Sequence, residues 1–277
     1  MPATAEITLA TLVRPTRPER PATTVFLPKE HGSWSLALEP LALGLLVAPS
    51  WAGGAFAVAA LAGFFARRPC KALAAPVATR RRGVGSAVAV FSVVAAGALA
   101  IVLVLGGVTA LWPLLLAAPL AALFAWFDAQ NGSRAAAAEV AGSAAFAIMP
   151  AVAATLAGWS AWSALAFAGL ALTRSVPTVL AVRCSLRRAK GETSRFTLPV
   201  LAAGVAAGAV SVLGAFRFVP AWAVVPPWVL FARTLWFARP SCPARPARSV
   251  GVFEAFLGLF YVGAIAAAYH AQPHAGI

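Results

Sequence analysis

Long apolar runs separated by short clusters of basic residues are the feature that most constrains this chain. The runs consist mainly of Ala, Leu, Val, Gly and Phe, and only 11% of the 277 residues are charged. A soluble domain devotes about a quarter of its residues to Asp, Glu, Lys and Arg, whereas a membrane-spanning helix needs about 20 apolar residues in succession. The pattern therefore predicts an all-α fold, a polytopic transmembrane helical bundle.

The apolar runs predict about nine spans. They are Trp34–Pro49, Trp51–Ala66, Val84–Leu105, Ala110–Phe127, Ala135–Leu156, Ser160–Val182, Thr197–Ala215, Pro220–Phe237 and Val250–Tyr269. The first two are short, because a rise of 1.5 Å per residue gives each a length of roughly 24 Å. We expect a disordered cytoplasmic tail over residues 1–26, a single transmembrane helical domain over residues 27–270, and a short external tail over residues 271–277.

The basic residues between the spans predict the orientation of the chain. Cytoplasmic loops carry an excess of Lys and Arg, and alternate connections here are strongly basic, with only Arg217 on the other side. The amino terminus is then cytoplasmic and the carboxyl terminus external. The Ala-, Arg- and Pro-rich composition is typical of a high-GC bacterial genome, so the predicted location is the bacterial cytoplasmic (inner) membrane, with the lipid bilayer and its anionic lipids as partners.

Composition also argues against several classes of function. The net charge of +14 does not indicate nucleic-acid binding, because the basic residues lie in short loops and form no continuous face. The cysteines Cys70, Cys184 and Cys242 are far apart and fall in basic connections, which predicts free thiols and no metal site. We expect no cofactor. The oligomeric state is left open.

Several ionisable residues lie inside the predicted spans, where an isolated charge costs a few kcal/mol. They are Glu39, Glu139, Arg174, Arg233 and Glu254. All are predicted in the cytoplasmic half of the membrane, so they should face one another or a wet cavity. Two interpretations stay open, a set of ion pairs that orients the helices and a polar cavity that opens to the cytoplasm.

The sixth span combines a charge, a proline and a hydroxyl in Arg174, Pro177 and Thr178. Proline removes a helical hydrogen bond and frees a backbone acceptor, which suits a ligand site or a hinge. With the polar residues at the span ends, the ligand-binding candidates are Lys29, Glu30, His31, Glu39, Arg67, Arg68, Lys71, Asp128, Glu139, Arg174, Thr178, Arg183, Arg187, Lys190 and Glu254. No residue is assigned a catalytic role.

Several motifs resemble the YwiC-like family of bacterial multi-pass membrane proteins. They are Pro28-Lys29-Glu30-His31-Gly32-x-Trp34, Arg68-Pro69, Trp126-Phe127-Asp128-Ala129, Arg174-Ser175-x-Pro177 with its extension to Glu192, and Gly251-x-x-Glu254. The resemblance implies a multi-pass membrane protein and supplies no biochemical role.

The layout is also similar to that of UbiA-type intramembrane prenyltransferases, which have nine spans and functional loops after the second and sixth. That family holds a Mg²⁺-diphosphate with aspartate-rich motifs in those loops. The corresponding stretches here, residues 67–71 and 183–192, contain no aspartate, and Mg²⁺ requires carboxylate oxygens. The resemblance therefore implies the scaffold without that metal chemistry.

Three functions follow as hypotheses. The first is a protein with a cytoplasm-facing polar cavity that binds or transports an anionic solute or a lipid headgroup. The second is a UbiA-like transferase acting on an isoprenoid or lipid phosphate. The third is a non-catalytic membrane assembly subunit in which the buried charges only fix helix packing. We favour the first, which requires no catalysis, and leave open whether the protein is an enzyme.

Overall fold

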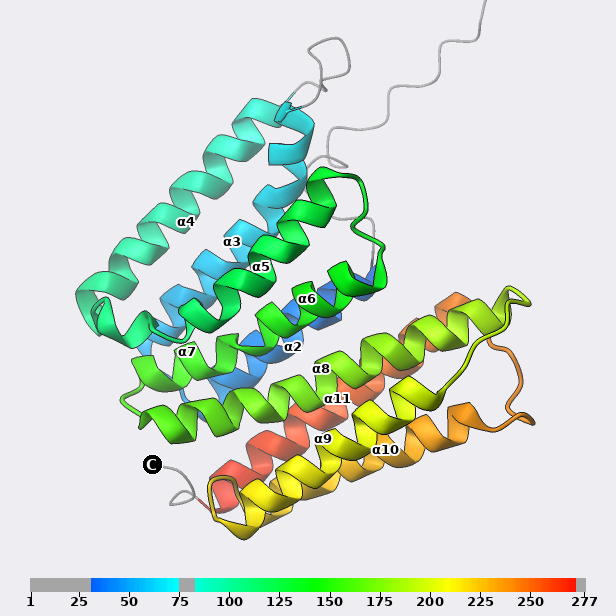
Figure 1. Ribbon diagram of the computed structural model, residues 1–277. Helices are drawn as coiled ribbons and strands as arrows, with labels where there is room; N and C mark the ends of the chain where they lie inside the picture. The colour runs from blue at the N-terminus through cyan, green and yellow to red at the C-terminus, as the bar shows by residue number, and fades with distance from the viewer. Residues whose placement is uncertain (1–30, 75–82, 273–277) are drawn as a thin grey trace, which may run out of the picture.

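The computed structural model describes residues 31–74 and 83–272, and at residues 31–36 it describes the backbone alone. Every regular element within these ranges is helical, which confirms the predicted all-α class for them (Figure 1). The tail predicted over residues 1–26 lies outside the described residues, as does most of the predicted carboxyl-terminal tail.

The helices follow one another with short connections. They are α2 (His31–Val47), α3 (Trp51–Ala74), α4 (Val84–Gly106), η2 (Thr109–Leu111), α5 (Leu114–Ala129), α6 (Ala136–Ala147), α7 (Met149–Leu156), α8 (Ala161–Ala189), α9 (Thr197–Ala215), η3 (Ala221–Val224), α10 (Val225–Ala238) and α11 (Ala247–Ala271).

Six helical segments of the described chain are long and apolar enough to cross a membrane, so the protein is a multi-pass membrane protein. They are Val84–Gly106, Ala136–Leu156, Ala161–Ala189, Thr197–Ala215, Ala221–Ala238 and Ala247–Ala271. Ala37–Val47 and Leu114–Ala129 are shorter apolar helices. The number of spans shown is therefore smaller than the predicted nine. The second predicted span falls short because α3 carries Arg67, Arg68 and Lys71 within its last turns.

Two helices extend beyond their predicted spans into the basic connections. The second span was expected to end at Ala66, but α3 continues through Pro69 to Ala74. The sixth was expected to end at Val182, whereas α8 runs to Ala189 and includes Pro177. The spans were predicted from runs of apolar residues, so the prediction ended where the sequence becomes basic and missed these additional helical turns. The arginines predicted to lie in loops are thus held on rigid helices.

The long helix α8 is the centre of the bundle. It packs against α6 and α7 on one side and against α9, α10 and α11 on the other, and α2 lies against α7 and α11 (Figure 1). The largest buried side chains of this region include Leu43, Phe167, Leu170, Tyr261 and Ile265. Alanines fill most of the remaining contacts, and small residues allow helices in a membrane to approach closely.

The hairpin of α3 and α4 forms one edge of the bundle. A second apolar cluster, with Leu41, Phe56, Ala57, Val102 and Val152 at its centre, joins this hairpin to α2 and α7. Most of α4 faces outward with an apolar surface, which a bilayer accommodates and water does not.

The helices alternate in direction, so their connections gather at two ends. We call the basic end the one formed by the connections 130–135, 190–196 and 239–246 with the adjoining helix termini, together with the end of α3 and the start of α4. The far end holds the connections 48–50, 107–113, 157–160 and 216–220. Along the chain, most cations of α3, α8 and α10 lie in the half of the helix nearer the basic end, whereas Arg217 lies in a connection of the far end. The fold thus brings to one end of the bundle basic residues that lie far apart in the sequence.

Gly44 tests the contact between α2 and α7. A Cβ at this position would lie 2.9 Å from the Ala153 Cβ and 3.3 Å from the Pro150 Cα. We expect Gly44→Leu to lower stability by about 1–3 kcal/mol, the usual cost of overpacking, as measured by unfolding of the purified protein in detergent. Gly54→Leu is the control, because a Cβ there meets nothing within 4 Å. Equal effects of the two substitutions would contradict the close packing of α2 on α7.

Candidate functional site

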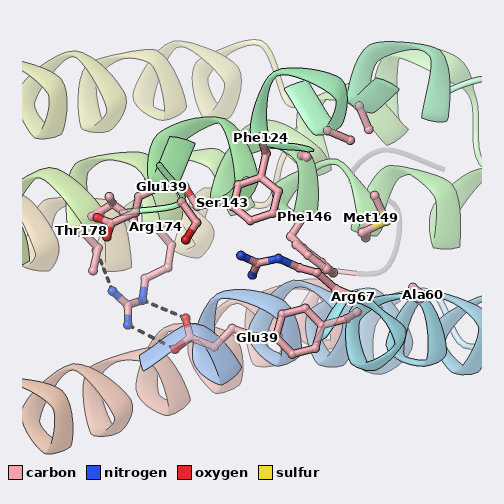
Figure 2. A pocket seen from close by; sticks show the side chains of 18 of the residues that line it. Glu39, Ala60, Arg67, Phe124, Glu139, Ser143, Phe146, Met149, Arg174 and Thr178 are labelled. Atoms are coloured by element: carbon pink, nitrogen blue, oxygen red, sulfur yellow. Dashed lines mark hydrogen bonds and ion pairs between the residues drawn. The ribbon is translucent and has the colours of Figure 1, made fainter. Parts of the chain in front are cut away.

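A cavity of about 1110 Å³ lies between the α3–α4 hairpin and the rest of the bundle. Its walls come mainly from α3, α5, α6 and α8, with single residues of α2, α4 and α7 and two of α11 (Figure 2). Ligand pockets commonly measure about 300–1,000 Å³, so this space exceeds what a small solute requires.

Most of the cavity lining is apolar. Phe56, Ala60 and Gly63 line it from α3, and Leu114 and Ala117 line it from α5. Alanines on both helices and Gly63 on α3 leave space between the larger apolar side chains. The cavity is therefore less polar than the sequence led us to expect, and its charged groups are concentrated in part of the lining.

Most of the predicted ligand-binding candidates line this cavity. They are Glu39, Arg67, Glu139, Arg174, Thr178, Arg183, Arg187, Lys190 and Glu254. Five different helices supply eight of them, four of which come from α8, and Lys190 follows directly after α8. Their role in binding stays a prediction, but the structure brings them to one place.

Arg174 forms the centre of a buried ion network. Its Nε lies 3.1 Å from Glu39 Oε2, and its Nη1 donates to Glu254 Oε2 at 3.2 Å (Figure 2 shows the Glu39 pair). Its Nη1 also donates to Thr178 Oγ1 at 2.6 Å, and its Nη2 to the Glu254 carbonyl at 2.8 Å. The side chains of Arg174, Glu254 and Glu39 are only 6%, 9% and 15% exposed. One guanidinium thus ties α2 and α11 to α8.

Arg233 completes the network from α10. Its Nη2 donates to Glu254 Oε2 at 2.8 Å and to Thr178 Oγ1 at 3.1 Å. Two arginines and two glutamates balance in charge, as the cost of isolated charges in a membrane requires. Glu254 Oε1 and Arg233 Nη1 are buried without a hydrogen-bond partner among the described residues. Glu254 lines the cavity, but this oxygen is itself buried.

A neutral polar pair lies next to this network and was not predicted. The hydroxyls of Thr173 and Tyr261 lie 2.7 Å apart, and the Tyr261 hydroxyl donates to the Leu170 carbonyl at 2.7 Å. The pair joins α8 to α11. The sequence carries a weak signal for it, since Tyr261 is one of only two tyrosines in the chain.

Gly258 explains how the Glu39 carboxylate fits against α11. A Cβ at position 258 would overlap the Glu39 carboxylate group. A glycine is therefore required where α2 brings its buried charge against α11. Spacing along the sequence did not indicate this relation, because the two residues belong to the first and last helices of the described chain.

At the basic end, Glu139 and Glu192 are each paired with an arginine. Arg183 Nη1 contacts Glu139 Oε2 at 2.5 Å and donates to the Arg134 carbonyl at 2.9 Å. Arg187 Nε donates to Glu192 Oε2 at 2.9 Å. These pairs are more exposed than the Arg174 network, and within the described part of the chain they leave other guanidinium donors available to a ligand.

Arg67 reaches into the cavity from α3 (Figure 2). Its Nε and Nη2 donate to the two carboxylate oxygens of Asp128 at 3.0 and 2.9 Å. Its guanidinium carbon lies 4.5 Å from the centre of the Phe124 ring. Lys71 Nζ donates to Asp128 Oδ1 at 3.1 Å and to the Asp128 carbonyl at 2.8 Å. Asp128 thus holds cations of α3 against α5.

The remaining candidates are not brought to the cavity wall. Arg68, Lys71 and Asp128 do not line it, although Asp128 contacts Arg67, which does, and Lys71 contacts Asp128. Lys29 and Glu30 lie outside the described residues, and so does the side chain of His31. Their predicted place at the mouth of the cavity therefore stays a prediction.

The sequence did not predict most of the uncharged residues that line the cavity. Gly142, Ser143, Phe146 and Met149 line the cavity from α6 and α7. Their spacing is that of one helical face, but in a span with apolar residues on every side nothing distinguishes that face. Among the described residues, no group of three or more His, Cys, Asp or Glu side chains could hold a metal ion.

Replacement of Arg174 tests the energetic role of the network. Arg174→Met leaves Glu39 without its partner and Glu254 with Arg233 alone, so we expect a loss of about 3–5 kcal/mol in stability. Unfolding in detergent measures this loss. Combining Arg174→Met with Glu39→Gln should cost less than the two separate changes together, because the second change removes the stranded charge.

Arg187→Met is the matched control for Arg174→Met. The side chains of Arg187 and Glu192 are 58% and 48% exposed, and such pairs contribute less than about 1 kcal/mol. If Arg187→Met lowers stability as much as Arg174→Met does, burial of the Arg174 network does not make it more stabilising than an exposed ion pair.

Comparison with known proteins gives one family match. A family model described as YwiC-like protein matches residues 27–154, a region that runs from α2 into α7. It includes the motif that begins at Pro28 and the Trp126–Ala129 segment, whereas the motifs in α8 and α11 lie beyond it. No curated protein and no solved structure matches the chain. The match over residues 27–154 agrees with the resemblance to the YwiC-like family that the motifs within this region predicted.

Proposed function

We propose that this membrane protein binds an amphipathic anion, with the charged group at the basic end of the cavity and the hydrocarbon part in its apolar interior. The observation that carries the proposal is a cavity of about 1110 Å³ whose lining is mainly apolar but includes cations of α3 and α8. A small inorganic ion would leave the apolar part of the cavity without contacts. A neutral lipid would leave the cations of the lining without a negative charge to bind.

The charge balance at the basic end supports an anionic ligand. The side chains there that line the cavity, together with those linked to them through ion pairs, include five cations, Arg67, Lys71, Arg183, Arg187 and Lys190, and three carboxylates, Asp128, Glu139 and Glu192. Five cations against three carboxylates leave two positive charges in excess. The Arg174 network is neutral by comparison, so the excess lies toward the end of the cavity that the connections form.

The orientation in the membrane is part of the proposal. Basic residues are enriched on the cytoplasmic side of bacterial membrane proteins, so we infer that the basic end faces the cytoplasm and that the protein resides in the bacterial inner membrane. The anionic group of the ligand would then lie near the cytoplasmic surface, at the depth of lipid headgroups, and the chain would extend toward the centre of the bilayer.

A UbiA-like transferase has less support from the site. Metal-dependent diphosphate chemistry would need carboxylates free to bind Mg²⁺. At the basic end, Asp128, Glu139 and Glu192 are each paired with an arginine. A role as an assembly subunit requires no ligand at all, and it becomes the alternative outcome of the experiment below.

Obstruction of the cavity tests the proposed function. A Cβ on Gly63 meets nothing within 4 Å, and Gly63 lines the cavity. Gly63→Phe should therefore enter the cavity without a clash and displace the ligand. We expect lipid mass spectrometry of the purified protein to find an anionic amphiphile bound to the wild type and at least about tenfold less of it bound to Gly63→Phe, since steric exclusion removes the binding site.

Gly97→Phe on α4 is the matched control. A Cβ on Gly97 also meets nothing within 4 Å, but Gly97 does not line the cavity, so this variant should retain the wild-type ligand. Equal retention by both variants would contradict binding in the cavity. A wild-type protein that carries no anionic amphiphile in either membranes or detergent would favour the assembly subunit.

A further inference from the structure

We propose that Arg67 is the residue that recognises the anionic group of the ligand, and that this group is a phosphate monoester carried on a lipid chain. Asp128 and Phe124 hold the Arg67 guanidinium in place, and cations of α8 bind the same group from another wall of the cavity. This inference rests on the proposed function, and it names the chemical class of the ligand and the residue that selects it.

The first observation is that Arg67 uses only one edge of its guanidinium within the protein. Its Nε and Nη2 form a bidentate pair with the Asp128 carboxylate. A guanidinium has five N–H donors arranged in a fork, so the two N–H groups of Nη1 and one of Nη2 remain. Among the described residues these donors have no hydrogen-bond acceptor, and the residue lines the cavity. The free edge is suited to a second oxyanion.

The second observation is that the Arg67 side chain is fixed before any ligand binds. The Asp128 carboxylate is buried, the two hydrogen bonds define the plane of the guanidinium, and the Phe124 ring lies against it. Lys71 bonds to the same carboxylate and to its backbone carbonyl. A donor group that is already ordered loses little conformational entropy on binding. Asp128 is therefore a positioning residue for Arg67 and need not touch the ligand.

The third observation is that α8 supplies further donors to the same cavity. Arg183, Arg187 and Lys190 line it at the basic end. Arg183 and Arg187 each use one nitrogen for a carboxylate partner, and Lys190 has no ion pair with a described side chain. Donors from α3 and from α8 can therefore approach one anionic group from two sides.

These three observations favour a phosphate monoester over other anions. A carboxylate or a phosphate diester carries one negative charge, whereas a monoester carries about −1.5 to −2 at pH 7 and offers three terminal acceptor oxygens. Three oxygens can accept bonds from separate helices at once, and the excess of positive charge exceeds what one negative charge would neutralise. The apolar interior of the cavity accounts for the lipid chain.

The test measures binding of defined lipids to the full chain in phosphatidylcholine nanodiscs by native mass spectrometry. The probes are phosphatidic acid, a lipid monoester, phosphatidylglycerol, a diester, and inorganic phosphate. We expect phosphatidic acid to bind at least about tenfold more tightly than phosphatidylglycerol. Arg67→Ala should weaken phosphatidic acid binding by at least about tenfold, in the range for a hydrogen bond to a charged group. Arg67→Lys should lose most of this affinity too, since lysine has no second edge.

Companion variants separate recognition from folding. Asp128→Asn should weaken binding of phosphatidic acid and Asp128→Glu should restore part of it, while both keep the wild-type elution profile and helix content. Arg217→Ala removes a cation at the far end and should leave the affinity unchanged. Wild-type affinity in Arg67→Ala and Arg67→Lys, or equal binding of the monoester and the diester, would overturn the inference.

The outcomes also distinguish a lipid phosphate from inorganic phosphate, and a failure of this inference from a failure of the proposed function. Inorganic phosphate that binds as tightly as phosphatidic acid would support the phosphate site and overturn its lipid source. If Arg67→Ala keeps the bound amphiphile while Gly63→Phe loses it, the assignment of Arg67 fails and binding in the cavity stands. If both variants keep it, the proposed function fails as well.

Discussion

The contact between Arg174 and its carboxylates is the interaction on which the arrangement of this bundle depends. Arg174 lies on the central helix α8, and its partners Glu39 and Glu254 lie on the first and last helices of the described chain. None of these charges is tolerable alone in an apolar medium, so each helix is held where the other two can satisfy it. Gly258 makes this possible, because any larger residue would occupy the place of the Glu39 carboxylate.

The cavity exists because the α3–α4 hairpin and the rest of the bundle are joined by two separate contacts. The apolar cluster around Phe56 and Val102 joins them toward the far end, and the pairing of Arg67 and Lys71 with Asp128 joins α3 to α5 at the basic end. Between these contacts, alanines and glycines on α3 and α5 leave a space. An amphipathic anion matches this division, because apolar and cationic surfaces occur in one enclosure.

The family match covers only one part of the chain, whereas the candidate site takes residues from inside and outside that part. The YwiC-like match over residues 27–154 includes the walls of the cavity formed by α2, α3, α5 and α6. The wall formed by α8, with Arg174, Thr178 and the cations of its last turns, and the contribution of α11 lie outside it. The candidate site is therefore assembled from both halves of the chain, and the matched half alone would lack the partners of Glu39 and Glu139.

The sequence by itself determined the class of the protein and the identity of its charged residues. Apolar runs predicted helices in a membrane, because only a helix satisfies its own backbone there, and buried charges such as Arg174 and Glu254 predicted a shared polar region, because each is costly alone. Only the tertiary structure decided which charges meet, since Glu39 and Arg174 are 135 residues apart and five ionisable residues allow several pairings. It also decided that Glu139 pairs with Arg183, that Asp128 holds Arg67, and that alanines and glycines leave a largely apolar cavity. Hydropathy does not distinguish one face of a uniformly apolar helix from another, so these relations arise only when the helices pack.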